Sequence, residues 1–155
     1  MPKQLRRKSS HNRKTKAVQS PAPLPNLRPG LSATCEKDVP FEWTIAHFNA
    51  DLPPVLSTPA MIGMMEVAAA RAVQPALAPG MITVGTRIEV DHLKAVPAGS
   101  HVTASAKLER LDGRFLRFSV EANSGGQLIG RGRVFRAVVE PGRFSKKAVN
   151  TGGEN

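Results

Sequence analysis

The sequence is poor in the features that mark several large classes of protein. Cys35 is the only cysteine among 155 residues, which excludes an intrachain disulfide and a cysteine-based metal cluster and is compatible with a reducing compartment. No apolar run approaches the ~18 residues that a membrane span needs. The four histidines lack the spacing of a metal site, and there is no glycine-rich loop of the nucleotide-binding type. We therefore expect neither a metal nor a retained cofactor.

Acidic residues are absent from residues 1–30, which hold eight lysines and arginines. The other 14 of the 22 bases are nearly balanced by the 12 acids, all of which lie in residues 31–155. Most of the net charge of +10 therefore belongs to residues 1–30. Residues 1–27 are also rich in Ser, Asn, Gln and Pro without apolar periodicity, which predicts a disordered basic tail that ends in a Pro-rich linker.

The role of this tail stays open. A nucleic-acid arm, a tether to an anionic surface and an organellar transit peptide all fit a basic, acid-free composition. The tail lacks the interleaved aromatic residues that stack on bases, so we expect at most non-specific contact with nucleic acid. The protein is accordingly expected to be cytoplasmic, or organellar if residues 1–27 are a transit peptide.

Residues 28–140 are predicted to form one α+β domain, followed by a flexible tail over residues 141–155. Two glycine-containing turns, Asp112-Gly113 and Gly125-Gly126, separate the last three strand-like segments in the manner of hairpins. One long helix would then pack against an antiparallel meander. In chain order, the expected elements are a strand at 31–39, a short helix at 41–48, a long helix from about 58, and strands at 81–93, 100–110, 114–123 and 128–140.

The long helix is almost uncharged. Pro59 suits the first helical turn, and Ser57 or Thr58 can cap it. Glu66 flanks the apolar stripe, where a buried carboxylate would need a partner; this makes Glu66 a candidate functional residue. The stripe itself has helical spacing and comprises Met61, Met64, Met65, Ala68, Ala69, Ala72 and Val73.

The strand at 81–93 alternates between apolar and charged residues, and alternate side chains point to opposite faces of a sheet. Gly85 falls with the charged residues on the outward face. An inward His92 beside an inward Glu66 would form an acid/base pair. The predicted inward set is Ile82, Val84, Thr86, Ile88, Val90 and His92.

Residues 53–69, 84–93 and 128–136 resemble the corresponding segments of hotdog-fold acyl-CoA thioesterases, in particular the fluoroacetyl-CoA thioesterase-like proteins. The resemblance implies a curled antiparallel sheet wrapped around one long central helix. It also implies a homodimeric thioester hydrolase that acts on a short or small acyl-CoA. Coenzyme A would then be part of the substrate and product, not a cofactor. A non-catalytic acyl-CoA-binding module of the same fold is the alternative.

The same resemblance assigns the catalytic residues Thr58, Glu66 and His92, with Gly85 lining the acyl site. Leu52 stands near the position where fluoroacetate-specialised members carry a Phe as a gate. Glu66 would activate water or attack the carbonyl, His92 would act as acid and base, and Thr58 would either orient these groups or attack. Because eight helical residues rise ~12 Å, we expect Thr58 to lie in the loop before the helix.

Each of these residues also has a structural explanation. Thr58 would be a helix cap, Glu66 a solvent-facing flank residue, His92 a hydrogen-bonded core residue and Gly85 a bulge. Arginines near the end of the domain suit the phosphates of coenzyme A, although a solvated sheet face explains them equally well. These arginines are Arg87, Arg131, Arg133 and Arg136, of which Arg131 and Arg133 share one strand face and are the predicted substrate-binding pair.

Overall fold

The computed structural model describes residues 24–143. The predicted basic tail therefore lies outside the described residues except for its last four, and the predicted C-terminal tail lies outside except for its first three. Within the described linker, Leu27 is buried and Leu24 packs against the same core. Packing thus extends to the N-terminal side of residue 28. No helix in the described range is long and apolar enough to cross a membrane.

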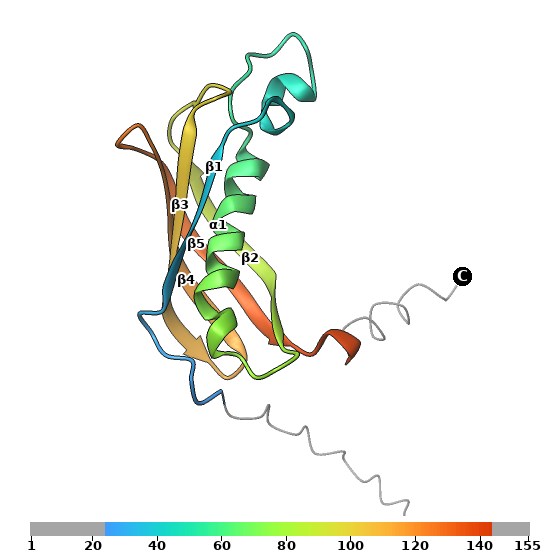
Figure 1. Ribbon diagram of the computed structural model, residues 1–155, viewed down its shortest axis with the longest axis vertical. Coiled ribbons are helices and arrows are strands. Elements are labelled where there is room, and N and C mark those ends of the chain that lie inside the picture. Colours follow the sequence, from blue (N-terminus) through green and yellow to red (C-terminus); the bar gives the residue numbers. More distant parts are fainter. Residues whose placement is uncertain (1–23, 144–155) are drawn as a thin grey trace, which may run out of the picture.

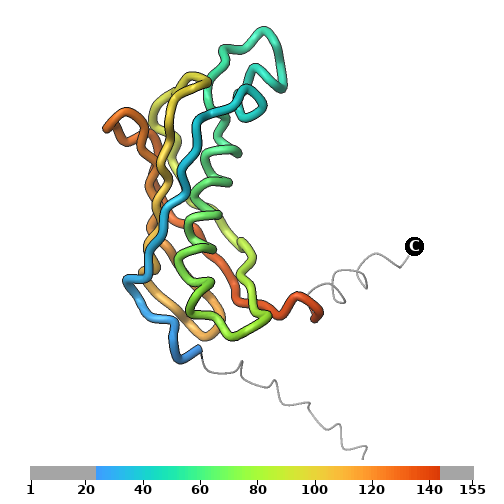
Figure 2. Tube along the Cα trace, in the orientation of Figure 1, coloured from blue at the N-terminus to red at the C-terminus, as the bar shows by residue number. Residues whose placement is uncertain are grey.

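A five-stranded sheet curls around one long helix (Figures 1 and 2). The strand order is β1-β3-β4-β5-β2, and every neighbouring pair is antiparallel. The α+β architecture predicted from the sequence is confirmed, and β1 and β2 form the edges of the sheet. The elements are β1 (Ser32–Asp38), η1 (Phe41–Trp43), η2 (Ile45–His47), α1 (Thr58–Val73), η3 (Gln74–Ala76), β2 (Ile82–His92), β3 (His101–Asp112), β4 (Phe115–Ser124) and β5 (Gln127–Val139).

The start of α1 follows from its capping residue. The Ser57 hydroxyl accepts a hydrogen bond from the Ala60 amide at 3.4 Å, and Pro59 occupies the first turn. Thr58 is the first residue of the helix itself, so its expected place in the preceding loop is wrong. Because Ser57 takes the cap, the Thr58 hydroxyl is left for another partner.

The predicted apolar stripe is the buried face of α1: all seven of its members are buried. It packs on the inner face of the sheet, where Phe118 of β4 is fully buried. Helix and sheet are in close contact at Gly130, since a Cβ there would lie 2.5 Å from Met61 Sδ. Burial of each large apolar side chain stabilises the fold by about 1.5–3 kcal/mol, and Gly130 makes this close packing possible.

A β-bulge reverses the expected facing of the first half of β2. Its register with β5 shifts between Gly85 and Arg87, and a bulge inserts one extra residue into the alternation. Thr83 is therefore buried, whereas Ile82 and Thr86 are exposed. The prediction that Ile82, Val84 and Thr86 point inward, with Gly85 outward, is wrong for this physical reason. After the bulge, the predicted facing of Ile88, Val90 and His92 holds, because they pair with the inward-facing Val134, Gly132 and Gly130.

Candidate active site

Thr58 and His92 meet where α1 begins and β2 ends. The Thr58 Oγ1 and His92 Nδ1 atoms are 2.9 Å apart, a hydrogen bond across 34 residues of sequence. His92 Nε2 is buried and has no hydrogen-bond partner within residues 24–143. If the hydroxyl donates to Nδ1, the ring proton must lie on Nε2. This contact is the geometry of a nucleophile beside its general base.

A cavity of about 310 Å³ opens beside this pair. Most of its walls are apolar, with one hydroxyl, one imidazole and one ammonium group among them. The ammonium group of Lys94 donates a hydrogen bond to Gln127 Oε1 at 2.8 Å, which ties it to the start of β5. The cavity is lined by Ile45, Val55, Leu56, Thr58, His92, Leu93, Lys94 and Ala95.

Glu66 belongs to a second cluster, in the middle of α1. Its Oε1 atom accepts a hydrogen bond from Arg136 Nη1 at 3.0 Å. Arg136 also donates from Nε to Thr83 Oγ1 at 2.9 Å and from Nη2 to the Thr83 carbonyl at 2.8 Å. The Arg136 side chain is 8% exposed and that of Glu66 is 34% exposed. The arginine is thus held on three sides between the sheet and the helix.

Burial lowers the pKa of Arg136 from its ordinary value, and the Glu66 carboxylate acts in the opposite direction. A guanidinium nevertheless stays protonated in proteins. Glu66 therefore supplies the negative charge that a nearly buried cation needs. The partner that the apolar surroundings of Glu66 require is an arginine, not the predicted histidine.

Gly85 lies against this second cluster. A Cβ built on Gly85 would overlap Glu66 Oε1 and lie 3.2 Å from Glu66 Cδ. No other residue fits between β2 and the carboxylate without moving one of them. The absence of a side chain at Gly85 thus allows the backbone of β2 to approach the Glu66–Arg136 pair.

The predicted catalytic residues therefore fall into two groups. The structure brings Thr58 to His92, and Glu66 to Gly85. It does not bring Glu66 to His92: Glu66 does not line the cavity beside the imidazole, and no hydrogen bond joins the two within residues 24–143. Eight residues of α1, about 12 Å, separate Thr58 from Glu66.

Leu52 lies in the loop that precedes α1, and its side chain is 42% exposed. Two further apolar side chains of the same end of the molecule are exposed, Phe41 and Phe48. The His47 ring stands edge-on to both, with centroid separations of 6.2 and 5.7 Å. Leu52 is not among the residues that line the Thr58–His92 cavity, so its gating role stays a prediction.

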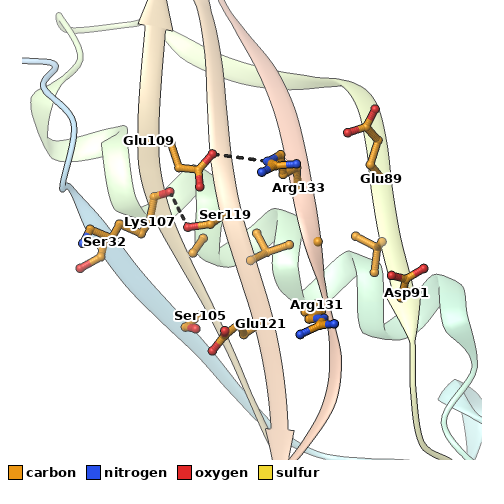
Figure 3. A pocket seen from close by; sticks show the side chains of 14 residues that line it. Ser32, Glu89, Asp91, Ser105, Lys107, Glu109, Ser119, Glu121, Arg131 and Arg133 are labelled. Atoms are coloured by element: carbon orange, nitrogen blue, oxygen red, sulfur yellow. Dashed lines mark hydrogen bonds and ion pairs between the residues drawn. The ribbon is translucent and has the colours of Figure 1, made fainter.

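Arg131 and Arg133 occupy the outer face of the sheet, turned away from α1 (Figure 3). Arg131 lies between its cross-strand neighbours Asp91 and Glu121. Arg133 Nε is 3.6 Å from Glu109 Oε2. Acids thus surround both predicted substrate-binding arginines, and neither lines the cavity beside Thr58 and His92.

Arg136 is the site residue whose role was not predicted: from the sequence it was a candidate for the phosphates of coenzyme A or for a solvated sheet face, on the opposite side of its strand from Arg131 and Arg133. A signal was present: by strand alternation Arg136 shares a face with Val134 and Val138, both of which are buried. An arginine on an apolar face requires a buried hydrogen-bond acceptor, and Glu66 on the apolar helix requires a buried donor.

Comparison with known proteins identifies the family to which this architecture belongs. Residues 39–141 match the family described as fluoroacetyl-CoA-specific thioesterase. The chain belongs to this family. It is 38% identical over 127 residues to the fluoroacetyl-CoA thioesterase of Streptantibioticus cattleyicolor, covering 78% of this chain and 91% of that protein.

Solved structures agree with the sequence match. A fluoroacetyl-CoA thioesterase structure superposes with a TM-score of 0.76 at 36% identity, covering 83% of this chain and 98% of that one. A thioesterase superfamily member from Thermus thermophilus gives 0.74 at 27% identity, covering 84% and 94%. A hot-dog-like protein from Thermanaerovibrio acidaminovorans shares the fold, with a TM-score of 0.75. The predicted hotdog fold, family and thioester hydrolase class are thereby confirmed.

Proposed function

We propose that this chain hydrolyses the thioester of a short or small acyl-CoA to the free acid and coenzyme A, with Thr58 as nucleophile and His92 as its base. The observation that carries the proposal is the 2.9 Å contact between Thr58 Oγ1 and His92 Nδ1 beside a cavity of about 310 Å³. A threonine hydroxyl is a weak nucleophile unless an adjacent base removes its proton.

The reaction then proceeds in two halves. Thr58 Oγ attacks the thioester carbonyl while its proton passes to His92 Nδ1. The carbon–sulfur bond breaks, and the leaving thiolate takes that proton to give free coenzyme A. Water then attacks the Thr58 ester with His92 again as base, and the acid leaves as Thr58 regains its proton. The positive end of α1, whose first residue is Thr58, favours the negative charge that develops on the carbonyl oxygen.

Glu66 acts in this proposal as a positioning residue. Its carboxylate already accepts a hydrogen bond from Arg136 and abuts Gly85, which fixes both groups and leaves it less suited to activate water. Arg136 is in turn held by Thr83. This cluster would present a rigid polar edge toward a small acyl group, with the Glu66 carboxylate as its more exposed member.

A second copy of the chain would unite the two clusters. Val67 on the solvent side of α1, Ile88 on β2 and Leu93 just beyond it are large apolar side chains that remain exposed in one chain. β1 and β2 also leave free strand edges, which pairing between copies would satisfy. We therefore propose a homodimer whose site combines Thr58 and His92 of one chain with the Glu66–Arg136 pair of the other.

We infer the compartment from composition. The single cysteine, Cys35, suits the reducing cytoplasm, which we propose as the location. The alternative, a transit peptide in residues 1–27, predicts an organellar protein whose mature form lacks those residues. N-terminal sequencing of the protein purified from its native cells distinguishes the two.

Release of free thiol from acetyl-CoA, propionyl-CoA and fluoroacetyl-CoA tests the activity. We expect turnover by the unaltered chain, loss in Thr58→Ala and His92→Ala, and a smaller loss in Glu66→Gln. Tight binding without turnover would instead identify the non-catalytic binding module. Mixing Thr58→Ala with Arg136→Ala tests the shared site: only a site assembled from two chains regains activity in the mixed dimer.

A further inference from the structure

The cavity beside Thr58 and His92 is lined by one cationic side chain and by no acidic one. Its lining contains the ammonium group of Lys94 but neither an aspartate nor a glutamate. Lys94 also takes part in no ion pair within residues 24–143. By contrast, Arg87 and Arg136 each have a glutamate partner. The charge of Lys94 is therefore left for a group that enters the cavity.

The Lys94 side chain is held in place without being neutralised. Its Nζ atom donates a hydrogen bond to Gln127 Oε1 at 2.8 Å, and a side-chain amide carries no charge. The backbone amides of Leu93 and Lys94 both donate to the carbonyl of Ile129, at 2.7 and 3.3 Å. The start of β5 thus fixes both the backbone and the side chain of Lys94. An ammonium group has three donors, so two of them remain for a ligand.

The wall of the cavity that comes from the segment before α1 is apolar, and it consists of Ile45, Val55 and Leu56. This segment is joined to the chain that follows β2, at the same end of the molecule (Figure 1). The Leu56 amide donates to the carbonyl of Val96 at 2.7 Å, and Val55 forms a bridge with Pro97. Apolar walls offer no partner to a charged group. A ligand with a negative charge would therefore have the ammonium group as its ionic partner.

Lys94 lies within reach of a short acyl group on Thr58. It follows His92 by two residues, so the Cα atoms of the two are at most about 7 Å apart. Both residues line the cavity, and His92 Nδ1 is 2.9 Å from Thr58 Oγ1. The third or fourth carbon of an acyl group on this hydroxyl would approach the ammonium group. A carboxylate there would accept charge-assisted hydrogen bonds, whereas a methyl group would leave the ammonium group unpaired.

We propose that Lys94 selects acyl groups that end in a carboxylate, so that the substrates are coenzyme A thioesters of short dicarboxylic acids. This inference rests on the proposed function and names the substrate class of the same site. Lys94 determines which acyl group is accepted, and the bond-breaking steps stay with Thr58 and His92. The Glu66–Arg136 pair gives no such preference, because its two charges cancel.

Two pairs of substrates with matched chain lengths test the proposal: succinyl-CoA against butyryl-CoA, and malonyl-CoA against propionyl-CoA. In the unaltered chain, kcat/KM for the dicarboxylic member should exceed that for its partner about tenfold, the effect of one hydrogen bond between charged groups. Lys94→Met, which keeps the length of the side chain without its charge, should remove this preference, and Lys94→Arg should keep most of it. Lys107→Met removes an exposed cation from the outer face of the sheet (Figure 3) and should keep the whole preference.

Equal kcat/KM values for the two members of each pair in the unaltered chain would overturn the proposal. Equal losses for both members in Lys94→Met would also overturn it, because Lys94 would then contact a part that all four thioesters share. Calorimetric titration of Thr58→Ala with succinyl-CoA and butyryl-CoA makes the same comparison without turnover, and succinyl-CoA should bind about tenfold more tightly. That binding preference, together with no hydrolysis by the unaltered chain, would contradict only the proposed function.

Discussion

The contact between Gly85 and Glu66 predicts how Gly85→Ala changes stability. The substitution should destabilise the protein when Glu66 is present, but not when Glu66 has been replaced by alanine. Gly85→Ala places a methyl group on Glu66 Oε1, the atom that accepts the 3.0 Å hydrogen bond from Arg136. The backbone at Gly85 does not have a positive φ, so alanine fits the local conformation. The whole effect should therefore come from displacement of the carboxylate.

The magnitude can be estimated from the bonds involved. A hydrogen bond between charged groups contributes about 1.5–3 kcal/mol, and the 34% exposure of Glu66 reduces this to about 1–2 kcal/mol. Replacing Gly by Ala at a compatible position stabilises the folded protein by about 0.4–1 kcal/mol. We expect Gly85→Ala to destabilise the unaltered protein by about 1 kcal/mol. In a Glu66→Ala background the same change should be neutral or stabilising by about 0.5 kcal/mol.

Urea unfolding followed by circular dichroism and by the fluorescence of Trp43, the only tryptophan, measures all four members of this double-mutant cycle. Thiol release measured on the same four proteins shows whether displacement of Glu66 also lowers the rate. Equal destabilisation by Gly85→Ala in both backgrounds would refute the reasoning, because the methyl group would then be clashing with something other than Glu66.

Substitutions at three further positions test the nucleophile, the helix–sheet packing and the acyl gate. Thr58→Ser should keep most of the hydrolytic rate and Thr58→Ala should lower kcat by roughly 100-fold or more, with unchanged melting temperatures because this side chain is exposed; a rate retained in the alanine variant would make Thr58 an orienting group at most. Gly130→Ala should destabilise the fold by about 1–3 kcal/mol in urea unfolding, since its Cβ would lie 2.5 Å from Met61 Sδ, and a neutral result would mean that Met61 adapts freely. Leu52→Phe should lower kcat/KM for larger acyl groups about tenfold more than for acetyl if Leu52 gates the acyl site; an unchanged order of preference across an acyl-CoA series would rule that role out.

The elements of the fold were predictable because their signals are local. The apolar stripe of α1 has a period that only a helix satisfies, and all seven of its members are buried. The hairpin turns hold glycines with positive φ, 55° at Gly113 and 55° and 75° at Gly125 and Gly126. The facing of β2 was not predictable from alternation, because the one extra residue at Gly85–Arg87 changes the period without altering composition.

The site was harder to predict, since its contacts join residues far apart in sequence. The bond between Thr58 and His92 spans 34 residues, and only the resemblance to a family suggested it. The Glu66–Arg136 pair spans 70 residues, yet elementary electrostatics favours it. Each residue lies on an apolar face of its own element, and each alone would carry an unpaired charge into the core. Two such charges of opposite sign, on elements that must pack together, satisfy each other, so the sequence pattern favours Arg136 as the partner of Glu66 over the predicted His92.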